Sequence, residues 1–467
     1  MGSIGPATIL PAPLPVENAT KSFWRTDPHE LDEYRYHSVP RSCEVIIIGG
    51  GYAGIAAAYH LVAGLESVYD DEPIVDRNRP CVVLLEAREA CSGATGRNGG
   101  HLRPSVYTRL PSLIEQYGLE AAVELCAFED AHVPAIADII HTEGIDCDFM
   151  LTRSFDIYTD REEAKKAKAA YDALKAAGVV KSTMDHLEWT DEEDAEKVSG
   201  VKGCVGCFTF PAAHLSPYKL FMDLLEVANN TGKLNIQTGT PALSIHENAI
   251  NEPSGWTVET PRGNLHAKHV IVATNGYASH LLPEYVGKIV PCRGICSHIT
   301  CPPGSAAPKM KMSYCLRLPN GSQDYLIPRQ DGSIVVGGAR SEFFHKREQW
   351  YNNPDDATLI EPAKHYFDNY MQTHFTGWED SGAKVERLWT GVMGYTSDGL
   401  PSVGAVPDME NVWIAAGFEG HGMPVIWLTM NGIARMIKGA KFKESGIPRI
   451  YRTTRERLEE DRDDLAG

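Results

Sequence analysis

Short runs of branched, apolar residues alternate with glycine-rich turns along the chain. Residues 45–48 are valine and isoleucine only and lead directly into Gly49, and the runs at 269–276 and 411–417 also end in glycine. Uninterrupted apolar runs of this length are typical of strands that are buried on both faces of a parallel sheet. The pattern therefore predicts three buried strands, each followed by a glycine turn.

A helix and a further strand follow the first of these turns. The stretch 51–61 is rich in alanine and predicts a helix, and the apolar residues 81–85 predict a strand. This strand–helix–strand order before residue 90 is typical of a Rossmann-like unit. A polar insert at residues 66–80 separates the helix from the strand, and we expect it to form a surface loop.

The remaining pattern indicates a second kind of architecture. Residues 160–178 carry charged side chains beside alanines, which predicts an exposed helix. Between residues 290 and 340, short strand-like pieces alternate with turn residues, which predicts an antiparallel sheet. The expected fold class is α/β plus α+β, with a discontinuous Rossmann-like domain and a second domain built on a largely antiparallel mixed sheet.

The positions of these segments predict where the domain boundaries fall. The apolar, glycine-terminated runs lie near both ends and in the middle of the chain, so we expect the Rossmann-like domain to be discontinuous. We expect an extended arm at residues 1–40 and a tail at residues 446–467. The Rossmann-like domain is assigned to residues 41–110, 205–290 and 386–445, and the second domain to residues 111–204 and 291–385.

Length and overall charge narrow the classes of partner. The chain has 467 residues and a formal net charge of −18, from 44 basic and 62 acidic residues. An acidic surface repels nucleic acids and anionic membranes, so neither is an expected partner. The first forty residues contain several prolines and no apolar run long enough for a signal peptide or a membrane span, and a cytoplasmic protein is expected.

Cysteine usage points to a reducing compartment. The eleven cysteines are scattered, and an odd number without a secretory leader does not indicate a disulfide framework. Cys204 and Cys207 form a C-x-x-C pair, but no second pair follows at the spacing of a zinc site. We expect ordinary thiols and no bound metal.

Glycines at residues 49, 51 and 54 form the pattern G-x-G-x-x-G between the first strand and the helix. Gly49 permits a tight turn, Gly51 lets a pyrophosphate approach the backbone, and Gly54 lets helix and strand pack closely. Glu86 closes the second strand, where a carboxylate can accept hydrogen bonds from ribose hydroxyls. These residues predict a dinucleotide site that suits either NAD or FAD.

The residues that follow Glu86 distinguish between the two cofactors. Residues 84–88 and 92–101 resemble the flavin-binding stretch of the D-amino acid oxidase-like superfamily of FAD-dependent oxidoreductases. Residues 270–276 and 417–423 resemble later cofactor-contacting segments of that family, and the order of motifs is most similar to the glycine, sarcosine and γ-glutamylputrescine oxidase branch. The resemblance implies FAD as the cofactor and adds these contacts: Ala87, Arg88, Thr95, Arg97, Asn98, Gly99, Gly100, Ala273, Thr274, Gly417, Gly420, Gly422 and Met423.

The family resemblance also implies a reaction. A C–N bond of an amine or amino acid is oxidised by hydride transfer to flavin N5, which gives an imine that is later hydrolysed. Oxygen is the expected electron acceptor, with hydrogen peroxide as its product. The alternatives are an FAD-dependent dehydrogenase, or a biosynthetic flavoenzyme acting on a bulkier amine, that passes electrons to another acceptor.

Two departures from the family pattern restrict these implications. Sarcosine oxidases tether the flavin through a cysteine near the segment that is residues 389–396 here, and no cysteine is present. We therefore expect noncovalent FAD, although His101 leaves attachment through a histidine open. Sarcosine oxidases also present a lysine to oxygen in the strand that resembles residues 333–338, where Val335 is the counterpart, so the dehydrogenase alternative stays open.

Four residues are candidates for contact with the substrate or the reduced flavin. His101 and Arg103 follow the flavin-ring segment, and an arginine there could hold a carboxylate through a bidentate pair. Tyr325 lies on the predicted antiparallel sheet, where its hydroxyl could donate to a carboxylate or an amine. His421 stands between glycines beside the expected pyrimidine end of the flavin and could donate to the reduced, anionic ring. Each could instead have a structural role.

Two further interpretations of the sequence differ from an FAD-dependent oxidase in the cofactor that they require. A reductase that uses NADPH would need a second nucleotide motif after a strand, and none is found in the sequence. A binding module that keeps the nucleotide fold for partner recognition is a non-enzymatic alternative, and it would purify without flavin absorbance.

Overall fold

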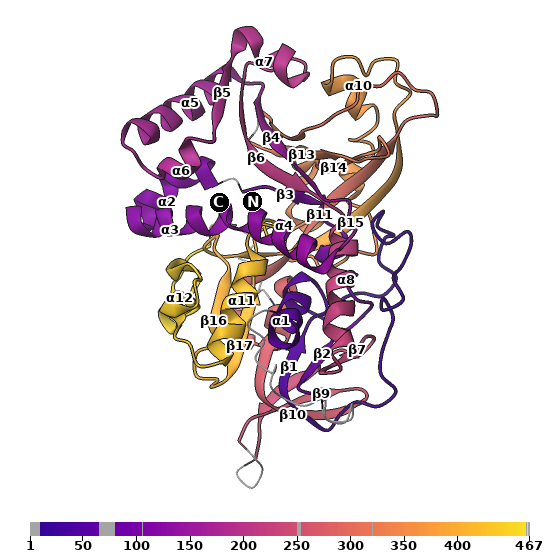
Figure 1. Cartoon of the computed structure of the whole chain (residues 1–467), viewed down its shortest axis with the longest axis vertical. Coiled ribbons are helices and arrows are strands. Elements are labelled where there is room, and N and C mark those ends of the chain that lie inside the picture. The colour runs from indigo at the N-terminus through magenta and orange to yellow at the C-terminus, as the bar shows by residue number, and fades with distance from the viewer. Residues whose placement is uncertain are drawn as a thin grey trace, which may run out of the picture.

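The computed structural model of this protein describes residues 10–64, 80–104, 106–249, 254–319, 321–463 and 465. The predicted surface loop at residues 66–80 lies outside these ranges except for Pro80, and so do residues 1–9 of the predicted arm. Figure 1 shows two sheets, one in each half of the molecule, with helices packed around them.

The first sheet contains the three predicted strands that end in glycine. Its strands are β1 (Ser42–Ile48), β2 (Val82–Leu85), β7 (Leu234–Gln237), β8 (Ser244–Glu247), β9 (Trp256–Thr260), β10 (Gly263–Val272), β16 (Ser402–Ala405) and β17 (Val412–Ala416). They follow the order β16-β17-β10-β1-β2-β7, with β9 paired to β10 and β8 to β9. The pairs from β17 to β7 are parallel, and β16 and β9 pair antiparallel with their neighbours. The α/β part of the predicted fold is confirmed.

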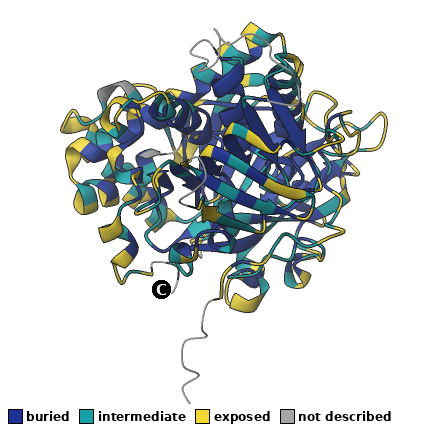
Figure 2. Cartoon of the chain, turned by 90° about the horizontal axis from the view of Figure 1, so that it is seen from below, coloured by how far each residue is buried: buried dark blue, intermediate teal, exposed yellow. Residues whose placement is uncertain are grey.

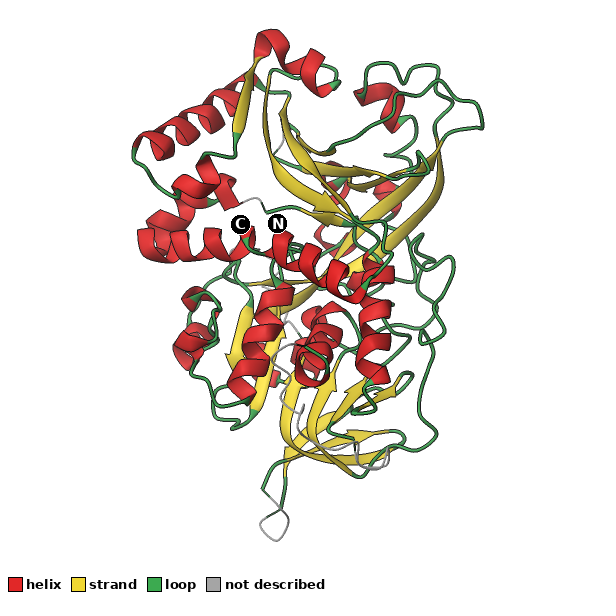
Figure 3. Cartoon of the chain, viewed as in Figure 1, coloured by secondary structure: helices red, strands yellow, loops and turns green. Residues whose placement is uncertain are grey.

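Three helices cover one face of this sheet (Figure 3). They are α1 (Tyr52–Val62), α8 (Pro217–Asn230) and α11 (Ile426–Ile437). Every residue of α1 is buried, because α8 and α11 pack against it and the strands lie beneath it. The alanines at residues 56–58 are small enough to let the helix approach the sheet closely.

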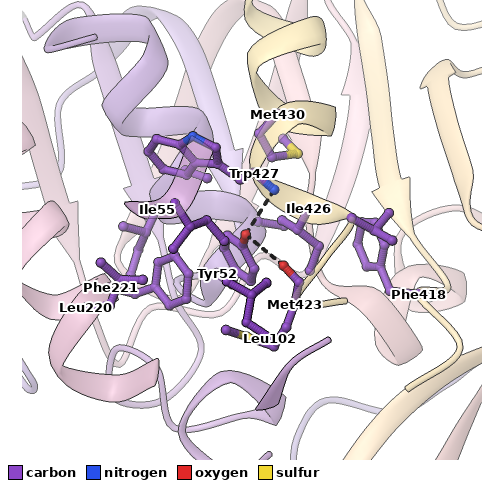
Figure 4. Close-up of a cluster of buried hydrophobic side chains, with 14 of the residues drawn as sticks. Tyr52, Ile55, Leu102, Leu220, Phe221, Phe418, Met423, Ile426, Trp427 and Met430 are labelled. Carbon is purple, nitrogen blue, oxygen red and sulfur yellow. Dashed lines mark hydrogen bonds between the residues drawn. The ribbon is translucent and has the colours of Figure 1, made fainter. Parts of the chain in front are cut away.

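Tyr52, the first residue of α1, ties these three helices together (Figure 4). Its ring stacks on Phe221 of α8 with 3.9 Å between the ring centroids. Its hydroxyl accepts a hydrogen bond from the backbone N–H of Trp427 at 3.0 Å and donates to the carbonyl of Met423 at 3.3 Å. The buried hydroxyl therefore accepts a hydrogen bond from a backbone N–H in the first turn of α11. No side chain among the described residues caps the start of this helix.

The second sheet is mixed and largely antiparallel. Its strands are β3 (His101–Leu102), β4 (Met150–Tyr158), β5 (Glu188–Asp191), β6 (Gly206–His214), β11 (Ile289–Thr300), β12 (Ser313–Arg317), β13 (Gln323–Pro328), β14 (Ile334–Gly338) and β15 (Lys384–Thr396). Their order is β15-β11-β14-β13-β12-β4-β6-β3, with β5 paired to β6. The β12–β4 pair is parallel and its neighbours pair antiparallel, which confirms the predicted α+β part of the fold.

Three strands of this second sheet come from segments that the sequence assigns to the other domain. They are β3, β6 and most of β15. In the chain, each of these strands lies next to an element of the first sheet. Each one pairs in space with a strand that is distant in sequence. Local patterns do not carry that information. The division into two domains itself stays a prediction.

The other helices lie around the second sheet and at the carboxyl end. They are α2 (Leu110–Tyr117), α3 (Leu119–Asp130), α4 (His132–Glu143), α5 (Arg161–Ala176), α6 (Lys181–Met184), α7 (Glu192–Ser199), α9 (Arg340–Phe343), α10 (Tyr370–His374) and α12 (Arg455–Glu459). Helix α5 is the predicted exposed helix, capped by Asp160, and Figure 2 shows how such exposed positions surround a buried interior. Within the described ranges, no helix has the length and apolar character needed to cross a membrane.

A buried carboxylate connects the amino-terminal segment to both sheets. Asp356 is 1% exposed and accepts a bidentate pair of hydrogen bonds from Arg88 at 2.9 and 3.0 Å, and Arg97 lies 3.4 Å away. The backbone of Thr20 donates to the carbonyl of Asp356, and the carbonyl of Val16 accepts from Arg88. The amino-terminal segment is therefore anchored by a charged network centred on a buried carboxylate.

We expect Asp356→Asn to destabilise the protein by about 3–5 kcal/mol, because it leaves two buried guanidinium groups without their carboxylate. Asp355→Asn is the matched control, since Asp355 accepts hydrogen bonds from Ala357 and Thr358 in a turn and is not buried. Thermal and urea unfolding of both variants check this. Equal loss of stability in the two variants would contradict it.

Candidate active site

A continuous cavity of about 410 Å³ runs between the two sheets. At one end it is lined by Gly49 and Glu86, at the carboxyl ends of the parallel strands. At the other end it is lined by Tyr325 and Arg340, on and just after strands of the second sheet. The carboxyl edge of a parallel sheet is the usual place for a ligand in such folds.

The glycine turn leaves no room for side chains. Gly49 has φ +113°, and a Cβ there would lie 2.6 Å from the carbonyl oxygen of Ala273. A Cβ on residue 54 would overlap the carbonyl oxygen of Gly49, and one on Gly51 would lie 2.9 Å from Oγ1 of Thr95. The turn ends at the start of α1, where Gly51 supplies no side-chain cap. Backbone amides at such a helix start can hold a phosphate, so the turn fits a dinucleotide.

Glu86 braces this turn from the end of β2. One carboxylate oxygen accepts a hydrogen bond from the amide of Gly50 at 2.7 Å, and the other accepts from the amide of Arg88 at 2.8 Å. Burial raises the pKa of Glu86, although these two hydrogen bonds oppose the rise. The side chain also lines the cavity, where its remaining acceptor capacity suits ribose hydroxyls.

The segment from Thr95 to Gly100 passes from the glycine turn to the second sheet. Asn98 folds it into a tight bend, accepting from the amide of Gly100 at 2.7 Å and donating to the carbonyl of Thr95 at 3.0 Å. Gly99 lies directly against the ring of Tyr325, where a Cβ would overlap the ring. This segment therefore connects the two ends of the cavity.

Arg97 is held inside the protein rather than extended. It is 3% exposed and donates to the carbonyls of Ser92 and Thr390 at 2.7 and 2.8 Å and to the hydroxyl of Thr20 at 3.1 Å. Burial lowers the pKa of Arg97 to about 10. Arg97 and Arg88 both line the cavity, and both guanidinium groups lie against the single carboxylate of Asp356.

Most of the predicted cofactor contacts face the cavity. The lining includes Gly49, Gly51, Glu86, Ala87, Arg88, Thr95, Arg97, Asn98, Gly99, Ala273, Thr274, Gly420, Gly422 and Met423. Gly54, Gly100 and Gly417 are not part of the lining. Gly100 and Gly417 have φ near +70° and are next to lining residues in the chain, and Gly54 lies within the first turn of α1.

The predicted substrate contacts Arg103 and His101 have partners inside the protein. Arg103 donates to Oγ of Ser154 at 3.0 Å and forms an ion pair with Asp156. Burial alone raises the pKa of Asp156, but Arg103 and Arg317 outweigh burial and lower it to about 2. Nε2 of His101 lies 2.7 Å from the hydroxyl of Ser313. Both residues line the cavity, but the charge of Arg103 is already paired.

Tyr325 and His421 also line the cavity, and each has a polar group of the protein within contact distance. The hydroxyl of Tyr325 lies 3.2 Å from Sγ of Cys296, and burial raises the pKa of Tyr325 well above its ordinary value, so the hydroxyl is neutral. Nε2 of His421 lies 2.8 Å from Glu129, which is fully buried on α3. Burial raises the pKa of Glu129, but His421 and Arg109 outweigh it and lower the pKa to about 2.

Sequence patterns did not single out three charged residues of the cavity, Arg293, Arg340 and Glu419. Glu419 has φ +53° and accepts hydrogen bonds from the backbone and the hydroxyl of Thr396. Burial raises the pKa of Glu419 to about 8. The one available signal was position, because Glu419 lies inside the glycine-rich segment 417–422 and Arg340 follows the glycines at the end of β14.

Three thiols in the cavity wall were likewise missed. Cys292, Cys296 and Cys315 are buried, and burial raises the pKa of the three thiols to about 12, 11 and 11. They remain protonated at neutral pH. Scattered cysteines carry no sequence signal for a shared wall. No group of three potential metal ligands gathers in the part of the chain that the structure describes.

The parallel sheet, its glycine turn and the second sheet across the cavity define a dinucleotide-binding protein. The sequence profile of the family described as FAD dependent oxidoreductase, DAO, matches residues 44–436. The chain therefore belongs to the DAO family of FAD-dependent oxidoreductases.

Similar proteins agree with this assignment. γ-Glutamylputrescine oxidoreductase of Escherichia coli is 25% identical over 433 residues, which cover 90% of this chain and 89% of the relative. Glycine oxidase of Bacillus licheniformis is 23% identical, covering 86% and 95%. The crystal structure of glycine oxidase from Geobacillus kaustophilus has the same fold, with a TM-score of 0.66 at 20% identity, covering 89% of this chain and 99% of that one.

We expect Glu419→Gln to raise the melting temperature at pH 8.5 and to leave it nearly unchanged at pH 5. A raised pKa means that the folded protein keeps a proton that the unfolded chain releases. The stabilisation from that proton is fully present below pH 4.5 and is lost as the pH rises to about 8. Glutamine keeps the acceptor for Thr396 and removes the titration.

Thermal unfolding of the flavin-loaded protein across this pH range is the measurement. Glu410→Gln, at an exposed position before β17, is the matched control and should show no such trend. A difference between Glu419→Gln and the unmodified protein that does not vary with pH would rule out the raised pKa.

Proposed function

We propose that this protein oxidises the C–N bond of an amine or an amino acid with FAD as the bound cofactor. The observation that carries the proposal is the single cavity that joins the glycine turn and Glu86 to Tyr325 and Arg340. The names of the two relatives specify γ-glutamylputrescine and glycine, which supports an amine or amino acid as the substrate here.

The residues around the glycine turn would hold the cofactor. FAD supplies the two-electron acceptor to which a substrate hydride passes at N5. The amides at the start of α1 would bind the pyrophosphate, and Glu86 would accept the ribose hydroxyls. The segment from Thr95 to Gly99 would run beside the ring, because it links the turn to Tyr325.

His421 is proposed as the residue that favours negative charge on the reduced ring. Glu129 is ionised, so it holds a proton on Nε2 of His421 and fixes the orientation of the imidazole. Arg109 also forms an ion pair with Glu129, so the negative charge of Glu129 is shared between Arg109 and His421. A positively polarised group held in place before the reaction stabilises charge that develops during it.

Tyr325 is proposed to face the substrate. Its neutral hydroxyl keeps a proton to donate, and its ring is fixed between Gly99 and Gly337, at either of which a Cβ would overlap the ring. A rigid donor loses little freedom when it binds a ligand. His101 and Arg103 stay proposals for substrate contact, with Arg103 paired to Asp156, a carboxylate that Arg317 also contacts.

We also propose a cytoplasmic location and noncovalent FAD. All eleven cysteines are free thiols, which suits a reducing compartment. Cys292, Cys296 and Cys315 are protonated thiols at neutral pH, because burial raises their pKa. Since the thiolate is the reactive form, this supports a flavin without a bond to cysteine.

Denaturing the yellow protein in acid should release the flavin completely into the supernatant, because no covalent bond holds it. The absorbance of the supernatant and of the washed pellet at the flavin band measures this. Flavin that stays with the pellet would contradict noncovalent binding, and the mass of the flavin-bearing peptide would then identify the attachment residue.

Anaerobic mixing with amines and amino acids tests the reaction itself. We expect the flavin absorbance to bleach with at least one amine or amino acid and to stay unchanged with the corresponding alcohols, since hydride leaves a carbon that bears nitrogen. A protein that purifies without flavin, or that no amine or amino acid bleaches, would contradict the proposed function.

We also propose oxygen as the electron acceptor, with hydrogen peroxide as its product. Val335 is fully buried, and no lysine is found among the described residues that line the cavity. This observation favours, as a second candidate, a dehydrogenase or a biosynthetic flavoenzyme on a bulkier amine with another acceptor. Hydrogen peroxide formed in air in step with amine consumption identifies the oxidase, and its absence identifies the second candidate.

A further inference from the structure

A short segment near the amino terminus forms part of the cavity wall. Pro13, Leu14 and Pro15 are among the residues that line the cavity. The profile of the DAO family begins only at residue 44, so these three residues precede the region that the family match describes. The family match therefore leaves the contribution of this segment to the cavity unassigned.

Hydrogen bonds hold the two ends of the segment at different walls. At one end, the amide of Ala12 donates to Oγ of Ser279 at 3.0 Å, and Ser279 follows β10. At the other end, the carbonyl of Val16 accepts from Arg88 at 3.0 Å, two residues beyond Glu86. The residues between these anchors therefore pass from the end of β10 to the end of β2, along the part of the cavity that Glu86 lines.

Prolines keep this segment extended. Pro11, Pro13 and Pro15 alternate with other residues, and each proline fixes its own φ and restricts the residue before it to extended backbone. Prolines also lack an N–H group, so two of the three residues between the anchors need no backbone acceptor. The segment therefore loses little further conformational freedom when it covers a ligand.

His280, which lines the same part of the cavity, has a ring nitrogen without a partner. Its Nδ1 donates to the carbonyl of Ala12 at 3.2 Å, because a carbonyl can only accept. An uncharged imidazole that donates from Nδ1 has an acceptor at Nε2. Nε2 is buried and has no hydrogen-bond partner among the described residues. Since a buried acceptor without a partner is costly, a donor on a ligand would stabilise this arrangement.

The position of Glu86 indicates which half of FAD this part of the cavity would receive. Glu86 is the proposed acceptor for ribose hydroxyls, and only the adenosine half of FAD contains ribose, since the flavin half carries ribitol. Ala242 and Leu281 add apolar surface to the lining. Adenine has two apolar faces and one kind of N–H donor, its exocyclic amino group. Apolar walls with a single free acceptor fit this base.

We propose that residues 12–16 form one side of an adenine site, in which Leu14 covers the base and Nε2 of His280 accepts a hydrogen bond from the adenine amino group. His280 couples the two parts of the site, because its Nδ1 holds Ala12 while its Nε2 binds the base. FMN has no adenosine half and would gain nothing from these contacts, so the segment gives the site a preference for FAD. This inference rests on the noncovalent FAD of the proposed function.

Titration of the protein, after its flavin has been removed, with FAD tests His280 without turnover. His280→Asn keeps a donor at the position of Nδ1 and removes the acceptor at Nε2. We expect it to weaken FAD binding about 5- to 10-fold, as for the loss of one neutral hydrogen bond. The change in flavin fluorescence gives the dissociation constants.

An FAD analogue that carries purine in place of adenine is the matched ligand, since it lacks only the amino group. The unmodified protein and His280→Asn should bind this analogue alike. A loss of the same size with FAD and with the analogue would overturn the hydrogen bond to the amino group.

Leu14→Ala tests the apolar cover. It should weaken the binding of FAD and of the purine analogue by the same factor, about 3- to 10-fold, because the lost contact does not involve the amino group. Leu10→Ala is the matched control, since Leu10 is 68% exposed, lies just before the segment and does not line the cavity. Equal FAD affinity in Leu14→Ala and Leu10→Ala would overturn the role of the segment.

Anaerobic bleaching of the unmodified protein separates this inference from the proposed function. The titrations measure FAD affinity and need no substrate. If the FAD-loaded protein is bleached by no amine or amino acid, the proposed function is overturned, whatever the titrations give. If His280→Asn and Leu14→Ala both bind FAD as tightly as the unmodified protein, the adenine site alone is overturned.

Discussion

Asp356 lies in the interior with Arg88 and Arg97, two cations from the segment that follows β2. Buried charges are tolerated only when they are paired and hydrogen-bonded, so the positions of these three side chains are mutually dependent. Thr20 joins the same network through the Asp356 carbonyl and through Arg97, and Arg97 in turn donates to the carbonyl of Thr390 on β15. The amino-terminal segment, the cavity wall and the second sheet are thereby held in one arrangement.

The same pairing determines which charges the cavity offers. Arg88, Arg97 and Arg103 line it, and their guanidinium groups lie against two carboxylates, Asp356 and Asp156. These two carboxylates therefore offset part, but not all, of the positive charge that the arginines bring to the cavity wall.

Two glutamates near residues 417–422 have pKa values that their surroundings shift in opposite directions. Glu129 contacts His421 and Arg109, and these two partners outweigh burial and lower its pKa to about 2. Glu419 is half-buried against Thr396 without a cation in contact, and desolvation raises its pKa to about 8. One carboxyl group is thus an anion that orients His421, and the other is a neutral acid, within one wall of the cavity.

The sequence by itself determined the parallel sheet around β1, the glycine turn and the place of Glu86. Those features depend on neighbouring residues: an apolar run, glycines where a Cβ would overlap the backbone, and an acid at the next strand end. Only the tertiary structure decided that β3, β6 and β15 join the second sheet, that Arg103 is paired, and that Arg340 and Glu419 face the cavity. The counter-charge of Arg88 is 268 residues away, so no local pattern reveals it. A backbone turn is encoded by adjacent residues, whereas the net charge of a cavity depends on which distant side chains the fold brings into contact.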